Sequence, residues 1–162
     1  MIQGTLTAQK PRSATKTILW AGLIAGTLDG AGAVTYYLLL GRKDPIKIFN
    51  FIASGIFGKT GLTGGLPMAF AGLLFHYIIA IIWATIFFLL YPKIHHVIKN
   101  KVVLGVLYGA FVWCGMNIIV LPLSSTPPIA FVPVNAMINM AILMAFIGIP
   151  ISLIVQKHYS KE

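Results

Sequence analysis

The chain has 162 residues, of which 58% are hydrophobic and only 9% are charged. This composition lies outside the range of soluble domains and indicates a membrane protein with one compact domain over residues 1–162. The formal net charge of +9 does not indicate nucleic-acid binding, because the basic residues lie between apolar runs and not along one face. Since Cys114 is the one cysteine, an intrachain disulfide and a thiolate metal cluster are excluded.

Four apolar runs are long enough to cross a hydrocarbon core of about 30 Å, which takes roughly 20 residues at helical rise. Each run must be helical, because lipid offers no partner for unpaired backbone groups. We therefore expect an all-α membrane protein, a four-helix transmembrane bundle with spans at about 17–40, 66–90, 102–122 and 134–156. Turn-forming residues mark the segments between them, at 41–44, 58–65, 91–101 and 122–133.

The first span carries Gly22, Gly26 and Gly30 at four-residue spacing. Such a stripe exposes helix backbone and lets another helix approach closely. Gly105 and Gly109 repeat the spacing in the third span. The partner is either another helix of the same chain or a second copy, and packing within the chain is favoured because any bundle of short-looped helices needs such contacts.

Asp29 is the one acidic residue inside a predicted span, and it falls near the middle of the first. A carboxylate at that depth costs roughly a few kcal/mol, so it must face the bundle interior or water, be paired, or be protonated. Two interpretations stay open with equal weight. Asp29 is either a functional site or a neutral side chain that hydrogen-bonds a neighbouring helix.

The segment 44–58 is too short to span a membrane and forms a separate element. Asp44 is placed as the N-cap and Pro45 at the first helical position. Polar residues such as Asn50 and Ser54 recur at helical spacing among apolar ones, which predicts an amphipathic helix that is interfacial or partly re-entrant. It is either a connector along the membrane surface or a lid or pore element.

His76 lies near the midpoint of the second span, at a depth similar to that of Asp29. Histidine changes its charge near neutral pH, and we hypothesise an Asp29–His76 pair that shares a proton and responds to pH. The alternative is a histidine whose hydrogen bonds serve packing alone.

A third group of polar residues is expected toward the external ends of the last two spans. These residues would form either a ligand pocket or a set of interhelical amide hydrogen bonds. They are Asn117, Ser124, Ser125, Thr126, Asn135 and Asn139.

Patterns of catalytic chemistry are weak in this chain. Ser124 and Ser125 have no plausible buried base beside them, and no glycine-rich phosphate loop follows a strand. Of the remaining histidines, His95 and His96 are adjacent and His158 lies in the tail, so a pair of axial haem ligands is not indicated. We expect no enzyme activity, no cofactor and no metal site.

The positive charges predict the orientation, because basic residues near the ends of spans stay on the cytoplasmic side. An even number of spans places both termini on one side. Eight basic residues belong to that side and four to the opposite one, which predicts cytoplasmic termini. The eight are Lys10, Arg12, Lys16, Lys93, Lys99, Lys101, Lys157 and Lys161, and the four are Arg42, Lys43, Lys47 and Lys59.

Four short segments together resemble the YagU family of small bacterial inner-membrane proteins. They are GLIAG at 22–26, IFN at 48–50, YPKI at 91–94 and PLSSTPP at 122–128. The resemblance spans most of the chain and keeps the order of these landmarks. It implies a multi-pass protein of the bacterial inner membrane that is linked to survival in acid and has no established biochemical activity. It also favours the PLSSTPP loop over Asp29 as a shared family site.

These observations lead to one function hypothesis and one alternative. The hypothesis is a homo-oligomeric pathway for protons, ions or small solutes, because four helices enclose little space. The alternative is a non-conducting scaffold that binds membrane lipids or a protein partner whose identity the sequence leaves open. A dry interior that seals Asp29 would favour the scaffold.

Overall fold

The computed structural model describes residues 13–128 and 132–160. These residues form helices and no strand, and four helical segments are long and apolar enough to cross a membrane. The first two are α1 (Ala14–Leu39) and α4 (Gly65–Ile94), with the shorter α2 (Ile46–Phe57) and α3 (Lys59–Thr63) between them. The third joins α5 (Lys101–Cys114), η1 (Gly115–Val120) and α6 (Leu121–Leu123), and the fourth joins α7 (Pro133–Leu143), η2 (Met144–Gly148) and α8 (Ile149–Tyr159). The expected all-α architecture of four spans and one short helix is confirmed.

The largest difference from the expected boundaries is at the end of α4, which continues past residue 90 to Ile94. Pro92 has no amide proton, so the carbonyl of Phe88, four residues earlier, loses its helical donor. The hydroxyl of Tyr159 donates to this carbonyl at 3.2 Å. A side chain of the last helix thus replaces the missing backbone bond and lets α4 continue through the proline.

The segment 58–65 is more ordered than the expected turn, since it contains α3. Gly61 allows this, because a Cβ there would lie 2.6 Å from the Cα of Ser54 in α2. The start of α2 also differs from the expectation, since the helix begins at Ile46 and Pro45 precedes it. Asp44 still acts as a cap, because its carboxylate accepts a hydrogen bond from the amide of Ile46 at 3.2 Å.

The third and fourth spans each contain a π-helical segment just before a proline. Pro122 follows η1 and Pro150 follows η2. A proline ring crowds the carbonyl four residues earlier, and a wider π turn relieves that crowding. Both spans are therefore irregular inside the bundle, a feature that hydropathy does not predict.

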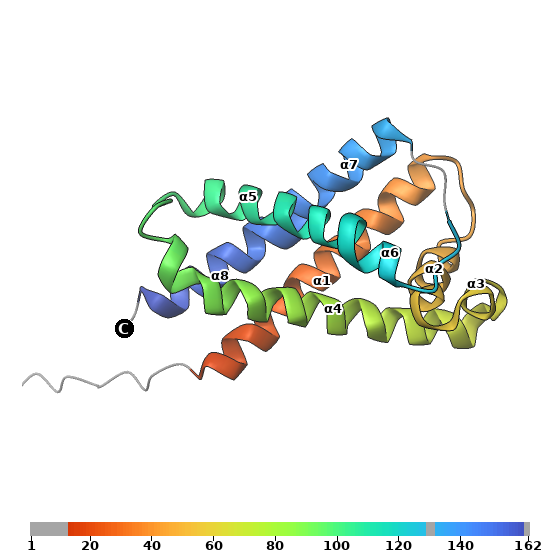
Figure 1. The fold of residues 1–162 in the computed structure, drawn as a ribbon, viewed down its shortest axis with the longest axis horizontal. Coiled ribbons are helices and arrows are strands. Elements are labelled where there is room, and N and C mark those ends of the chain that lie inside the picture. The colour runs from red at the N-terminus through yellow and green to blue at the C-terminus, as the bar shows by residue number, and fades with distance from the viewer. Residues whose placement is uncertain (1–12, 129–131, 161–162) are drawn as a thin grey trace, which may run out of the picture.

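Both ends of the described chain lie at the same end of the bundle (Figure 1). Thr17 near the start of α1 and His158 near the end of α8 are 3.0 Å apart between Oγ1 and Nδ1. The helices α2 and α3 lie at the opposite end, beside the connection that follows α6 (Figure 1). This arrangement agrees with an even number of spans.

The glycine stripes pack against other helices of the same chain. A Cβ on Gly22 would lie 2.7 Å from the Cα of Ile81 in α4. A Cβ on Gly105 would lie 2.7 Å from the Cα of Ile149 in α8, and one on Gly109 would meet the backbone of Met144. The stripes therefore form the α1–α4 seam and the seam between α5 and the fourth span.

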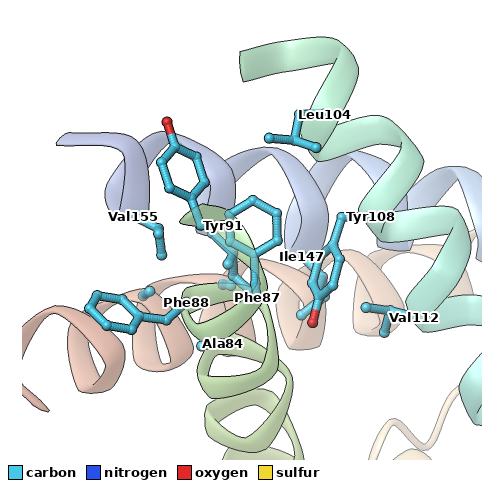
Figure 2. Packing of buried hydrophobic residues seen from close by; sticks show 12 residues of the cluster. Ala84, Phe87, Phe88, Tyr91, Leu104, Tyr108, Val112, Ile147 and Val155 are labelled. Carbon is cyan, nitrogen blue, oxygen red and sulfur yellow. The ribbon is translucent and has the colours of Figure 1, made fainter. Parts of the chain in front are cut away.

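Large aromatic side chains fill the interior toward the end where the chain starts and finishes. Figure 2 shows Phe87 of α4 beside Tyr108 of α5, and their ring centroids are 4.6 Å apart. The hydroxyl of Tyr108 donates to the carbonyl of Trp83 at 2.6 Å. Val112 and Val155 close this cluster from α5 and α8 (Figure 2). The packing is dense here, and the bundle is hollow further along.

An intramembrane cavity as the candidate functional site

A cavity of about 90 Å³ lies inside the bundle. All four spans contribute to its wall, and α2 contributes one residue, Ile52. The other lining residues are Asp29, His76, Ile79, Ala80, Trp83, Val112, Met116, Leu143 and Ile147. Most of the wall is apolar, so the carboxylate and the imidazole are its two ionisable groups.

Asp29 and His76 face the same cavity, as the sequence hypothesis requires. Within residues 13–128 and 132–160, however, Asp29 makes no hydrogen bond or ion pair. His76 instead places Nε2 at 2.8 Å from the carbonyl oxygen of Gly26. A carbonyl only accepts, so Nε2 carries a proton and donates it.

The imidazole of His76 packs against α1. A Cβ on Gly30 would lie 3.4 Å from the Nε2 of His76, so the ring packs directly on the helix that carries Asp29. Aromatic rings hold the other sides: the centroids of Phe49 and Tyr77 lie 6.4 and 5.6 Å from that of His76, both edge-on. The glycines of the first span thus position a histidine as well as a helix.

The short helix α2 covers the cavity at one end through Ile52. Its backbone touches α4, because a Cβ on Gly72 would collide with the carbonyl of Phe49. The polar residues Asn50 and Ser54 are buried against the protein, while Ile56 and Phe57 at the end of the helix are exposed. The helix therefore turns polar groups toward the protein and places Ile52 in the cavity wall.

The connection after α6 holds α2 in place. The amide of Ser125 donates to the carbonyl of Gly55 at 2.9 Å, and the hydroxyl oxygens of Ser54 and Thr126 are 3.3 Å apart. Ser124 accepts from the amide of Thr126 at 3.2 Å and so shapes the turn. Three residues of the predicted polar pocket thus serve to fasten the helix that covers the cavity.

The three asparagines of the predicted polar pocket are not brought together with this turn by hydrogen bonds. Asn117 donates to the carbonyl of Trp113 in its own span at 2.8 Å. Asn135 accepts from the hydroxyl of Tyr36 at 2.9 Å, which ties the fourth span to α1. Asn139 is exposed. The bond to Asn135 is an interhelical amide contact of the kind expected as the alternative to a ligand pocket.

Trp83 and Met116 are cavity residues that the sequence interpretation missed. The indole Nε1 of Trp83 donates to the sulfur of Met116 at 3.4 Å. Met116 belongs to η1, and the preceding Gly115 leaves space for the tryptophan, because a Cβ there would lie 2.5 Å from its ring. π turns occur frequently at functional sites, and Pro122 was the one sequence signal for this turn.

Within the described ranges, no three His, Cys, Asp or Glu side chains are placed to hold a metal ion. No family model, curated protein or solved structure matches this chain.

Proposed function

We propose that this multi-pass membrane protein conducts protons along a path that passes through the cavity lined by Asp29 and His76. The observation that carries the proposal is their common position in a cavity bounded by all four spans. An ionisable residue inside a membrane span marks an ion or proton path by default. A cavity beside Asp29 also favours the pathway over the sealed interior that a scaffold would have.

The size of the cavity favours protons over larger solutes. A volume of about 90 Å³ holds about three water molecules at roughly 30 Å³ each. A metal ion with its hydration shell does not fit, whereas a proton passes between a carboxylate, an imidazole and a few waters. The Nε2 bond to Gly26 leaves Nδ1 of His76 as the atom that exchanges protons.

The four spans and Ile52 of α2 surround a small cavity and not a continuous channel. Conduction therefore requires α2 to move, or a path between copies of the chain. We propose a homo-oligomer, since four helices leave little internal space.

Three of the segments that resemble the YagU family lie at α2 or beside His76. Asn50 of IFN lies on α2, PLSSTPP fastens α2, and GLIAG includes Gly26 beside His76. We propose that the protein acts in acid stress in a bacterial inner membrane, with both termini in the cytoplasm.

The test is proton flux into liposomes across an imposed pH gradient, read with an enclosed pH-sensitive dye. We expect flux with the native chain, none with Asp29→Asn, and native flux with Asp44→Asn, which removes a carboxylate outside the spans. His76→Gln keeps a donor for the Gly26 carbonyl but removes the exchangeable nitrogen, so flux should fall. Native vesicles no leakier than empty ones would sink the proposal and favour a scaffold.

A further inference from the structure

A second cavity, of about 310 Å³, opens at the end of the bundle where the described chain starts and finishes. Its volume is at the lower end of the roughly 300–1,000 Å³ that is usual for small-molecule sites. It lies between the ends of α4 and α8 and the start of the third span. Its lining residues are Tyr91, His95, Lys99, Gln156, Tyr159 and Ser160.

Stacked rings preform this cavity. Tyr91 stacks on His95 at 5.1 Å and 10° on one side and on Tyr159 at 5.0 Å and 23° on the other. The Tyr159 hydroxyl is directed to the carbonyl of Phe88 by the bond that bridges Pro92. A cavity whose walls are fixed in advance loses little entropy when a ligand enters.

The groups that face the cavity are mainly hydrogen-bond donors. Lys99, Gln156 and Ser160 each carry N–H or O–H groups. His95 donates from Nδ1 to the carbonyl of Tyr91 at 3.0 Å, which fixes the orientation of its ring in the cavity wall. Among the described residues these donors have no acidic partner, and such donors suit an oxygen-rich anion.

The charge at this end of the bundle is also positive. Neither described carboxylate lies here, because Asp29 is in mid-span and Asp44 precedes α2 at the other end. The C-terminal ends of α4 and α8 contribute about half a negative charge each, which the lysines outweigh. They are Lys16, Lys93, Lys99, Lys101 and Lys157.

The ends of the spans lie at the level of the lipid headgroups, where tyrosines are enriched and basic pockets between helices bind anionic lipids. We propose that this cavity binds the phosphate of an anionic phospholipid. Lys99 pairs with the phosphate oxygens, and Gln156 and Ser160 donate hydrogen bonds to the rest of the headgroup. This site is separate from the proton pathway and does not depend on it.

The test is native mass spectrometry of the full chain released from nanodiscs of equal phosphatidylcholine and phosphatidylglycerol. We expect the native chain to retain phosphatidylglycerol preferentially and Lys99→Gln to retain it about tenfold less, as the loss of one charge-assisted hydrogen bond predicts. Lys93→Gln is the matched control, because it removes the same charge at the same end from a residue outside the cavity. It should behave like the native chain.

Equal losses in the two variants, or no loss in either, would overturn the proposal and reduce the effect to general surface charge. A second arm adds glycerol phosphate, the headgroup without acyl chains, at millimolar concentration. Failure to displace the lipid supports the phospholipid as the ligand, whereas displacement supports the same phosphate site with a soluble ester. Since Lys99 is exposed, the unfolding temperature of Lys99→Gln should equal that of the native chain.

Discussion

The two halves of the bundle interior are packed in opposite ways. Around Phe87 and Tyr108, aromatic rings pack between α4 and α5 in the buried hydrophobic cluster (Figure 2). Toward α2, the same helices enclose the cavity with Asp29 and His76. Lipid provides no hydrophobic force between helices, so association depends on close packing. The dense half and the glycine seams therefore stabilise a bundle whose other half stays hollow around its ionisable groups.

The largest expected effect on the free energy of unfolding comes from truncating a side chain in the aromatic cluster around Phe87 and Tyr108. Phe87 is fully buried, and Phe87→Ala costs about 3–5 kcal/mol in soluble proteins. Because lipid replaces water as the reference, we expect the lower end, about 3 kcal/mol, in the free energy of unfolding. Unfolding in mild detergent, followed by circular dichroism, measures it. A loss below about 1 kcal/mol would mean that the aromatic half is not the stable part of the bundle.

A smaller effect is expected at the seam between α5 and the fourth span. A Cβ on Gly109 would meet the backbone of Met144, which a rotamer change does not relieve. We expect Gly109→Ala to lower the free energy of unfolding by about 1–3 kcal/mol. Gly30→Ala is the matched control, because its Cβ would lie at an ordinary 3.4 Å from His76. Similar melting curves for the two variants would contradict the claim that close packing at Gly109 stabilises the contact between α5 and the fourth span.

The smallest effect has the opposite sign. Asn50 is buried, and no described residue lies within hydrogen-bond distance of its Oδ1. A buried acceptor without a partner costs about 1–3 kcal/mol, so Asn50→Leu, which keeps the branching of the side chain, should raise the free energy of unfolding by about 1 kcal/mol. The same unfolding experiment measures the gain. A decrease would show that Oδ1 has a partner, such as a bound water, in the folded protein.

The spans were predictable because the length of each apolar run can be compared with the thickness of the hydrocarbon core. The placement of Asp29 and His76 at one depth also followed from counting along antiparallel spans. The helix that packs against each glycine stripe could not be predicted from the sequence, because the spacing of glycines indicates a face suited to close packing but does not identify the neighbouring helix. The hydroxyl of Tyr159 at Pro92 and the inward turn of Asn50 depend on contacts between residues far apart in sequence.

Because α4 is long, its tilt depends on the thickness of the bilayer. Its 30 residues extend for about 45 Å, against a hydrocarbon core of about 30 Å. The excess must stand outside the lipid or be taken up by tilt, and the tilt changes with membrane thickness. At Gly72, near one end of α4, the backbone of α2 packs directly against α4. A thinner or thicker membrane therefore acts on the helix that covers the cavity.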